Sequence, residues 1–401
     1  MKVIIHTQYY PPEIGAPQAR LSEFAESMVA KGHEVTVLTA MPNYPQGKIY
    51  AGYKGLYNRE TRNGVRVIRT WIYPTKSVSL LPRLTNYFSF VISSLLWGMA
   101  LLPKADYLLT ESPPLFLGIA GYLLSRIKGA CWIFNVSDLW PESAVRLGVI
   151  GEGLPLKISE RLESFCYRKS WLVTGQSREI LEGVSRKVPD VRTHYFSNGV
   201  DTRLFTPALR SGAIHEELGE GAECVAIYAG LHGIAQGLDQ IIEATKTLKD
   251  LKGKLRIVFI GDGAEKEALQ RQAQGIKIIK FLPPRPKKEI PGLLASSDIA
   301  LVPLKMHIPG AVPSKIYEAM ASCLPIVLVA EGEAARILID SRAGIAIPPA
   351  GTNGLAEALR RLTFDKELRL RLGKNGRQAA TEKFDREIII RRFLLVLEDN
   401  V

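Results

Sequence analysis

The feature that most constrains this chain is a repeated order of short apolar segments, turns rich in glycine or proline, and amphipathic helices. Residues 2–7 predict a buried strand, 11–17 a loop, 21–29 a helix and 35–39 a second strand. A strand, a loop, a helix and a further strand in this order form the unit of a parallel sheet covered by helices. The sequence therefore predicts an α/β fold.

The first half of the chain continues this pattern. Further strands are predicted at residues 65–71, 106–110, 131–136, 172–175 and 193–196. Residues 41–65, which are rich in tyrosine, glycine and asparagine, are interpreted as a long loop. An Asn-Gly pair predicts a turn at residues 198–201.

The same order begins again in the second half. Strands are predicted at 224–228, 257–260, 276–281, 299–302, 324–329 and 344–347, and helices at 332–340, 351–362 and 386–397. Residues 202–222, with one proline and three glycines, are interpreted as the connection between the halves. Because 401 residues exceed what one core usually serves, we expect two doubly wound parallel-sheet domains.

The composition of the chain favours some classes of binding partner over others. The net charge of +12 favours anionic partners, either phosphorylated substrates or an acidic membrane surface. Lysine and arginine are spread along the chain without an aromatic and basic platform, so nucleic acid is disfavoured. The four cysteines are scattered beside apolar residues and form no ligand pattern with the six histidines. We therefore expect buried free thiols in a reducing compartment and no metal site.

One apolar segment raises the question of a membrane. The first seven residues are too short an apolar run for a signal peptide, so we expect a cytoplasmic protein. Residues 87–102 carry no charge but are shorter than the roughly 20 residues that span a bilayer. They predict either a buried core helix or a helix lying on the membrane, where Lys76, Arg83 and Lys104 would meet anionic headgroups.

Residues 309–327 predict a loop, a helix and a strand. Ser314 is the predicted N-cap, and the backbone amides from Ser314 to Ile316 together with Lys315 suit a phosphate. Glu318, one turn further, suits the hydroxyl groups of a ribose. The alternative is an ordinary amphipathic helix with a solvated lysine and glutamate.

Glycine-rich turns follow two other strands of the second half. Candidate donor-binding residues there are Gly230, Gln236, Gly237, Gly261, Asp262 and Gly263, with Leu282 at the end of the next strand. The carboxyl ends of parallel strands meet at one edge of a sheet, and glycine permits close approach of a ligand. These turns and the helix at 314 favour a nucleoside diphosphate.

The first half holds further candidates at its strand ends. Gly15 follows the first strand, where a ligand approaches closely, and the loop lacks the G-x-G-x-x-G pattern of nicotinamide or flavin sites. Arg20, Trp140 and Glu142 are candidates for acceptor binding. Asp138 is either a catalytic carboxylate or a helix cap with Trp140 in the core.

As a set, these motifs resemble the retaining GT-B glycosyltransferases of family 4. The resemblance covers essentially the whole chain and rests on Gly15, 198–201, 228–237, 261–263 and 318–321 followed by Pro325. It implies two Rossmann-like domains facing across a cleft and a nucleotide-sugar donor. The forms at 313–315 and 138–143 look like the branch of bacterial O-antigen and capsule enzymes that includes fucosamine transferases.

The resemblance assigns roles residue by residue. Glu318 matches the second glutamate of the family's Glu-x7-Glu motif and would bind the donor ribose. Gly310 occupies the place of the first glutamate, which suits a deoxy or N-acetylated sugar. Leu231 and Gln236 stand where the family often has an arginine and a lysine for the diphosphate.

Local chemistry adds two catalytic candidates. Lys315 and the helix N-terminus would stabilise the diphosphate in place of the missing cations. The family often has a histidine where this chain has Ser137, which leaves Asp138 as the catalytic candidate there.

These observations predict an enzyme that moves a sugar from a UDP-sugar to a lipid-linked or saccharide acceptor with retention of configuration. No Asp-x-Asp pair is present, so we expect metal-independent chemistry without a cofactor. The rivals are a UDP-sugar 2-epimerase of the same fold, and a non-catalytic membrane-docked subunit.

The expected organisation follows. Residues 1–203 would form the acceptor-binding domain, 204–381 the donor-binding domain, and 382–401 a C-terminal helix packing back on the first domain. We expect the protein at the inner face of the cytoplasmic membrane, held by basic residues and the helix at 87–102.

Overall fold

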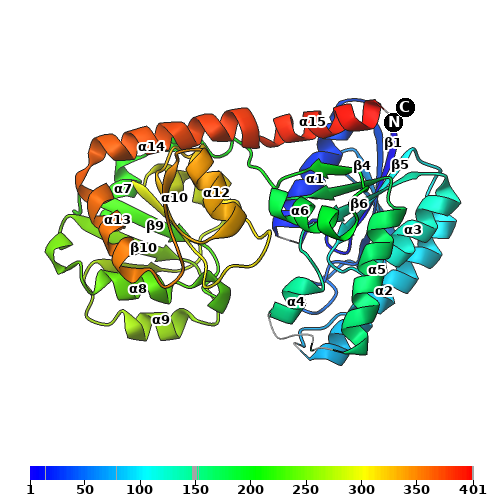
Figure 1. The fold of residues 1–401 in the computed structure, drawn as a ribbon, viewed down its shortest axis with the longest axis horizontal. Helices are drawn as coiled ribbons and strands as arrows, with labels where there is room; N and C mark the ends of the chain where they lie inside the picture. The colour runs from blue at the N-terminus through cyan, green and yellow to red at the C-terminus, as the bar shows by residue number, and fades with distance from the viewer. Residues whose placement is uncertain (14, 78, 147–150, 152, 400–401) are drawn as a thin grey trace. The chain divides into compact units, whose positions relative to one another are not determined.

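The chain forms two compact units (Figure 1). The computed structural model describes residues 1–13, 15–77, 79–146, 151 and 153–399, so Ile14 of the predicted loop at 11–17 lies outside the described residues. Unit 1 comprises Met1–Asn198 and Ile390–Val401, and unit 2 comprises Gly199–Ile389. The chain thus passes from unit 1 to unit 2 between residues 198 and 199, whereas the sequence predicts the boundary at residue 203.

Unit 1 contains an eight-stranded sheet in the order β3-β4-β2-β1-β5-β6-β7-β8. Its strands are β1 (Lys2–His6), β2 (Glu34–Ala40), β3 (Tyr57–Arg62), β4 (Val65–Thr70), β5 (Tyr107–Ser112), β6 (Cys131–Val136), β7 (Leu172–Gly175) and β8 (Thr193–Tyr195). Its helices are α1 (Ala16–Ala30), α2 (Leu80–Leu101), α3 (Leu117–Lys128), α4 (Glu142–Arg146), α5 (Leu154–Lys169), α6 (Arg178–Lys187) and the end of α15 (Arg386–Glu398). Among the strand pairs of the described residues, that of β3 with β4 is antiparallel and the others in this sheet are parallel.

β3 corrects the prediction of a long loop at residues 41–65. It forms a hairpin with β4 through Asn63 and Gly64, which have φ angles of 49° and 81°. The Asn-Gly pair is the usual signal for such a turn. Because β3 is an edge strand with mostly exposed side chains, its sequence lacks the apolar alternation that reveals a half-buried strand.

α2 reconciles the two interpretations of residues 87–102. Phe90, Val91 and Gly98 are buried, and α2 packs on β2, β4 and α3. Within the described part of the chain, Leu81–Leu101 is the one helix long and apolar enough to cross a membrane, judged by length and composition. The helix is thus a core helix along one face and an exposed apolar helix along the other.

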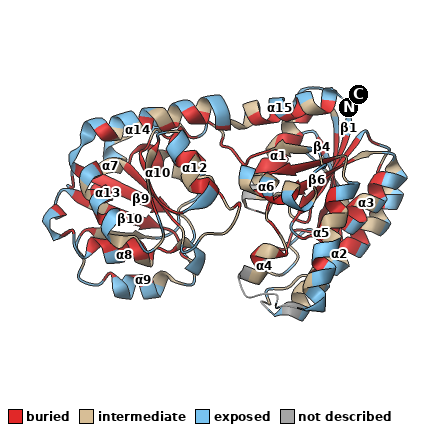
Figure 2. Ribbon diagram, in the orientation of Figure 1, coloured by how far each residue is buried: buried red, intermediate tan, exposed pale blue. Residues whose placement is uncertain are grey.

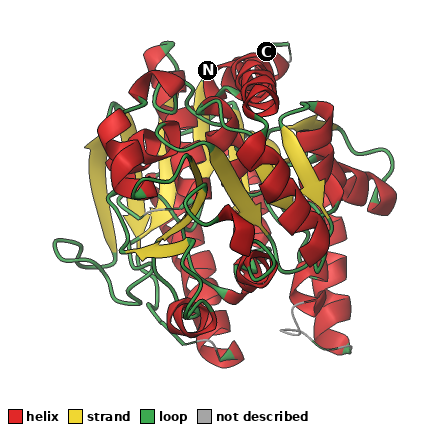
Figure 3. Cartoon of the chain, turned by 90° about the vertical axis from the view of Figure 1, so that its left-hand side faces the viewer, coloured by secondary structure: helices red, strands yellow, loops and turns green. Residues whose placement is uncertain are grey.

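Unit 2 contains a six-stranded sheet, parallel throughout, in the order β11-β10-β9-β12-β13-β14. Its strands are β9 (Cys224–Ala229), β10 (Leu255–Ile260), β11 (Ile279–Leu282), β12 (Ile299–Pro303), β13 (Ile326–Val329) and β14 (Gly344–Ile347). Its α-helices are α7 (Gly212–Gly219), α8 (Asp239–Thr245), α9 (Lys266–Gln272), α10 (Ile290–Ala295), α11 (Ser314–Ala321), α12 (Gly332–Asp340), α13 (Thr352–Phe364), α14 (Lys366–Ala379) and the start of α15. Helices and strands alternate as predicted (Figure 3).

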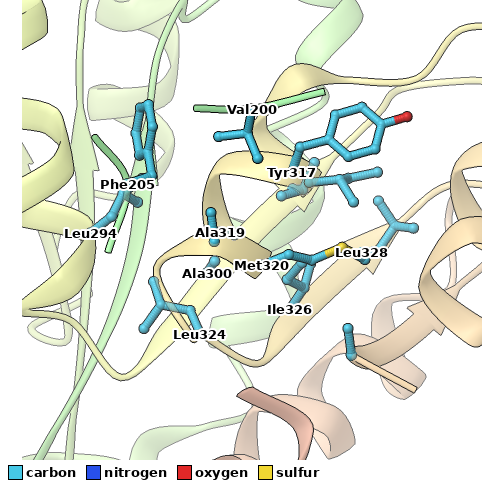
Figure 4. Packing of buried hydrophobic residues seen from close by; sticks show 14 of the residues in the cluster. Val200, Phe205, Leu294, Ala300, Tyr317, Ala319, Met320, Leu324, Ile326 and Leu328 are labelled. Atoms are coloured by element: carbon cyan, nitrogen blue, oxygen red, sulfur yellow. The ribbon is translucent and has the colours of Figure 1, made fainter. Parts of the chain in front are cut away.

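The core of unit 2 fixes α11. Tyr317, Ala319 and Met320 pack with Val200 and Ile326 in one buried cluster (Figure 4). This buried face fixes the position of α11 on the sheet of unit 2.

The end of α15 packs within unit 1. The Phe393 ring contacts Phe24 and Phe196, with centroids 5.4 and 4.6 Å away. The Tyr107 hydroxyl donates to the Leu397 carbonyl at 2.6 Å. In both units most strands are buried along their length, while the helices carry both buried and exposed residues (Figure 2).

Candidate active site

In the sheet of unit 2 the strand order reverses at β9, whose neighbours are β10 on one side and β12 on the other. This place is the topological switch point of the sheet. In open α/β sheets, ligands bind outside the carboxyl ends of the strands at such a point, because the loops diverge there. The loops after β9 and β10 carry the predicted glycine turns, and the loop after β12 leads into α11. The topology therefore gathers the donor-side candidates of unit 2.

The two glycine turns interlock. Gly230, Gly261 and Gly263 have φ angles of 153°, 148° and 156°, which side chains rarely allow. A Cβ at Gly261 would overlap the carbonyl oxygen of Gly230, and one at Gly263 would overlap that of His232. The His232 N–H donates to the Asp262 carbonyl at 2.8 Å. These three positions therefore require glycine.

The buried side chain of His232 supports the first glycine turn. Its fully buried ring lies near the rings of Phe259 and Phe281. Burial lowers the pKa of His232, which favours a neutral ring. Lys266 supports the second turn, because its Nζ donates to the Gly261 carbonyl at 2.8 Å. Sequence reasoning missed both residues, although each directly neighbours a predicted turn.

Lys315 lies against Gly230. A Cβ at Gly230 would be 2.5 Å from Lys315 Cε and 2.7 Å from its Nζ. The ammonium sits 5.4 Å from the ring centroid of Tyr228. Burial lowers the pKa of Lys315, and Glu318 opposes this shift. Among the described residues, this ammonium has no hydrogen-bond or ion-pair partner.

The start of α11 differs from the prediction in two respects. Pro313, not Ser314, is the N-cap, and the Ser314 hydroxyl instead donates to Glu318 Oε1 at 3.3 Å. The extended ψ of Pro313 lets the helix begin directly after it. The Ile316 N–H donates to the Pro313 carbonyl at 3.1 Å, and the Ile316 side chain is buried. Ile316 therefore offers neither amide nor side chain to a ligand.

The other donor-side candidates stay predictions. Gln236 ends a short 3-10 helix and is followed by Gly237 at a φ of 59°. The exposed Asp262 carboxylate accepts from the Gly263 N–H at 2.9 Å. Leu282 packs on the core at the end of β11, and Gly15 is the N-cap of α1 in unit 1.

Arg20 is the centre of a buried network in unit 1. Its Nη2 donates to both carboxylate oxygens of Glu111 at 2.9 Å, and its Nη1 donates to Asn198 Oδ1 at 2.9 Å. Both side chains of the ion pair are almost fully buried. This arrangement argues against the predicted contact of Arg20 with the acceptor, because its charge is already neutralised inside the unit.

The network joins the ends of neighbouring strands. Ser137 contacts Arg20 and Glu111, Asn135 donates to Glu111 Oε2 at 2.6 Å, and Thr174 donates to Asn135 at 2.7 Å. Glu111 was overlooked as the partner of Arg20. The available signal was a charged residue directly after the apolar stretch of β5.

Asp138 lies beside this network and is held by its own loop. Its Oδ2 accepts a hydrogen bond from the Ser143 hydroxyl at 2.7 Å. Burial raises the pKa of Asp138, while Ser143 and the Leu139 amide lower it. The contact with Ser143 of α4 gives Asp138 a structural role, and its burial also leaves a partly desolvated carboxylate suited to proton transfer.

Trp140 is partly exposed, and its buried part packs against the core of unit 1, as the alternative with Trp140 in the core predicts. Its ring meets the edge of Phe116 at 5.4 Å, and Phe116 contacts Phe88 of α2 at 4.7 Å between centroids. Glu142 is the first residue of α4. An aromatic row thus connects the Asp138 loop with the exposed face of α2.

Comparison with known families agrees with this geometry. Residues 213–379 match the glycosyl transferases group 1, and residues 15–199 match the glycosyl transferase 4-like domain. The chain belongs to the group 1 glycosyltransferases. The sheets of this glycosyltransferase have the GT-B arrangement expected from the sequence.

Individual relatives match this glycosyltransferase over most or all of its length. It is 28% identical to the putative colanic acid biosynthesis glycosyl transferase WcaI of Escherichia coli over 98% of this chain and 99% of that protein. It is 31% identical to the probable glycosyltransferase WbjE of Pseudomonas aeruginosa over 64% of this chain and 66% of that protein. The Anabaena protein HepE in complex with UDP has the same fold, with a TM-score of 0.70, 17% identity and full coverage of both chains.

Proposed function

We propose that this glycosyltransferase moves a sugar from a UDP-sugar to a lipid-linked or saccharide acceptor, with retention of configuration, in cell-surface polysaccharide biosynthesis. The observation that carries the proposal is Lys315, whose ammonium lies beside the interlocked glycine turns without an ion-pair partner among the described residues. A partly buried cation without an ion-pair partner, at the carboxyl ends of the parallel strands, suits an anionic diphosphate.

The relatives support the chemical class. The E. coli relative is named for colanic acid biosynthesis, and HepE structures contain UDP or UDP-glucose. Gly310 stands where the family has a glutamate for the donor sugar. A deoxy or N-acetylated hexosamine, as in the fucosamine transferase branch, fits a site that lacks this carboxylate.

Lys315 would act on the leaving group. In the transition state the sugar becomes an oxocarbenium-like cation while negative charge grows on the departing diphosphate. A preorganised cation at that charge lowers the barrier. Glu318, held by the Ser314 hydroxyl, would accept hydrogen bonds from the ribose. No step of this scheme requires a metal.

The acceptor would be lipid-linked and reached at the inner face of the cytoplasmic membrane. The row of Phe88, Phe116 and Trp140 supports this choice, because it continues the exposed apolar face of α2 to the Asp138 loop. An apolar row that continues from an exposed apolar helix suits the hydrocarbon chain of a lipid carrier.

The test is UDP release from a panel of UDP-sugars, including N-acetylglucosamine and N-acetylfucosamine, with and without bacterial lipid extract. We expect lipid-dependent release from one donor, and weaker donor binding in Glu318→Ala. Conversion of one UDP-sugar into another without UDP release would instead identify a 2-epimerase. Absence of both UDP binding and release would identify a non-catalytic subunit.

A further inference from the structure

The outward face of α2 is apolar along the helix. Its large exposed apolar side chains are Leu81, Phe88, Ile92, Leu96 and Met99, of which the last four follow one another at a spacing of three or four residues, and the exposed Thr85 lies between Leu81 and Phe88. Arg83 is the only charged residue of the helix. The opposite face is fixed in unit 1, since a Cβ at Gly98 would already lie 2.9 Å from Leu124. α2 therefore cannot leave the unit without breaking its core, but its outer face is open.

α3 widens this apolar face. Ile119, Leu123 and Ile127 are exposed at a spacing of four residues, and α2 and α3 pack side by side (Figure 1). Lys128 Nζ donates to the carbonyls of Met99 and Leu102 at 2.8 and 2.7 Å, which ties the end of α2 to α3. Exposed apolar residues gathered on two anchored helices indicate an interaction surface rather than scattered exposure.

α5 adds a cluster of cations next to α3. A hollow of about 620 Å³ is lined by Lys157, Arg161, Arg168 and Lys169 together with the single carboxylate Glu160. None of the four cations forms an ion pair within the described part of the chain. The Phe165 ring of this hollow meets the edge of Tyr122 on α3 at 5.1 Å, so α5 and its cations lie beside α3.

We infer that the exposed face of α2 and α3 and the cations of α5 form one docking surface for an anionic lipid bilayer. Apolar side chains enter the acyl boundary while lysine and arginine bind headgroup phosphates. This inference rests on the proposed function only in its choice of a lipid-linked acceptor. It adds α3 and α5 to the single helix that the sequence indicated.

Charge decides between a bilayer and a second copy of the chain. A symmetric dimer through this face would bring the same uncompensated cations of α5 toward one another, on a protein of net charge +12. An anionic bilayer neutralises them instead. The observed pairing of exposed apolar residues with unpaired cations is therefore complementary to a lipid surface.

The experiment is flotation of the full-length protein with phosphatidylcholine vesicles and with vesicles containing phosphatidylglycerol. We expect binding to the anionic vesicles that weakens with salt. Lys157→Glu/Arg161→Glu should weaken binding at least about 25-fold, since each cation near such a surface contributes about fivefold. Ile92→Glu should also weaken it, whereas the matched controls Ile339→Glu and Lys249→Glu/Lys252→Glu in unit 2 should not.

Four results would overturn the inference. The first three are absence of flotation, flotation that depends on neither the lipid charge nor the α5 variants, and a wild-type dimer that Ile92→Glu dissociates. The fourth is displacement of the protein from vesicles by glycerol phosphate at the same concentration as the lipid headgroups. That result would make the α5 hollow a site for free phosphate and would contradict docking. UDP binding, measured without lipid, tests the proposed function separately, so either proposal can fail alone.

Discussion

The switch points of the two sheets use charge in opposite ways. In unit 1, β1 lies between β2 and β5, and the polar groups near these strand ends neutralise one another through Arg20 and Glu111. In unit 2, β9 lies between β10 and β12, and the Lys315 ammonium meets backbone turns without an ion pair among the described residues.

This difference separates support from ligand binding. A buried cation whose charge is already paired holds elements together and has no free charge to offer a substrate. A partly buried cation without a partner costs desolvation free energy, which an arriving anion offsets. Changes in the unit 1 network should therefore act on unfolding, and changes at the unit 2 turns should act on donor handling.

The largest expected effect is on stability. Arg20→Ala leaves the Glu111 carboxylate buried and unpaired, which should lower the free energy of unfolding by about 3–5 kcal/mol. Urea denaturation measures this change. The control is Arg66→Ala, whose exposed pair with Glu34 should contribute less than about 1 kcal/mol. Equal losses in the two variants would contradict a structural role for the Arg20 network.

Lys315→Ala should act on turnover. Removing one preorganised charge at the leaving group should lower kcat about 100-fold, with little change in the free energy of unfolding. Steady-state UDP release measures kcat, and Lys252→Ala on the surface of unit 2 is the control. A loss below about threefold, far under the scale of one such donor, would remove Lys315 from catalysis.

The pH profile of the same step gives a second check. Burial lowers the pKa of Lys315, so its ammonium loses the proton at a lower pH than an ordinary lysine. Because only the charged form stabilises the diphosphate, kcat should fall as the pH rises through this pKa. Lys315→Arg should move the fall to higher pH, since arginine stays charged.

Gly261→Ala should weaken donor binding, with a smaller effect than those expected for Arg20→Ala and Lys315→Ala. Its φ of 148° and the overlap of a Cβ with the Gly230 carbonyl should cost about 1–3 kcal/mol and displace the first turn. Calorimetric UDP titration measures the affinity. Gly253→Ala, also at positive φ but with nothing within 4 Å, is the matched control for backbone strain alone. Equal affinity in both variants would argue against interlocked turns at the donor site.

The accuracy with which the sequence predicts the structure differs between parts of the two units. Apolar strands such as β6, β7 and β14 are predicted to the residue, because buried parallel strands are continuous apolar runs. β3 escapes prediction, because an exposed edge strand needs no apolar alternation. In the site, the required glycines are visible in sequence, since only glycine fits them.

Pairing over long sequence separation is what the sequence does not reveal. Arg20 meets Glu111 across 91 residues, so its burial depends on the sheet order and not on its own neighbours. For the same reason Lys315 is predicted beside a phosphate, while its approach to Gly230 emerges only from the packing of α11.

The smallest expected effect tests which role Asp138 has at the edge of the unit 1 network. Ser143→Ala removes one hydrogen bond to the carboxylate and should cost about 1 kcal/mol of unfolding free energy. Because Ser143 lowers the pKa of Asp138, its removal should raise that pKa further. If ionised Asp138 takes part in transfer, the acid limb of the kcat profile moves to higher pH, while Ser159→Ala, a buried serine of α5, leaves it in place. A profile unchanged in both variants would make Asp138 a loop brace, and unit 1 would then contribute a framework without a charged catalytic group at this position.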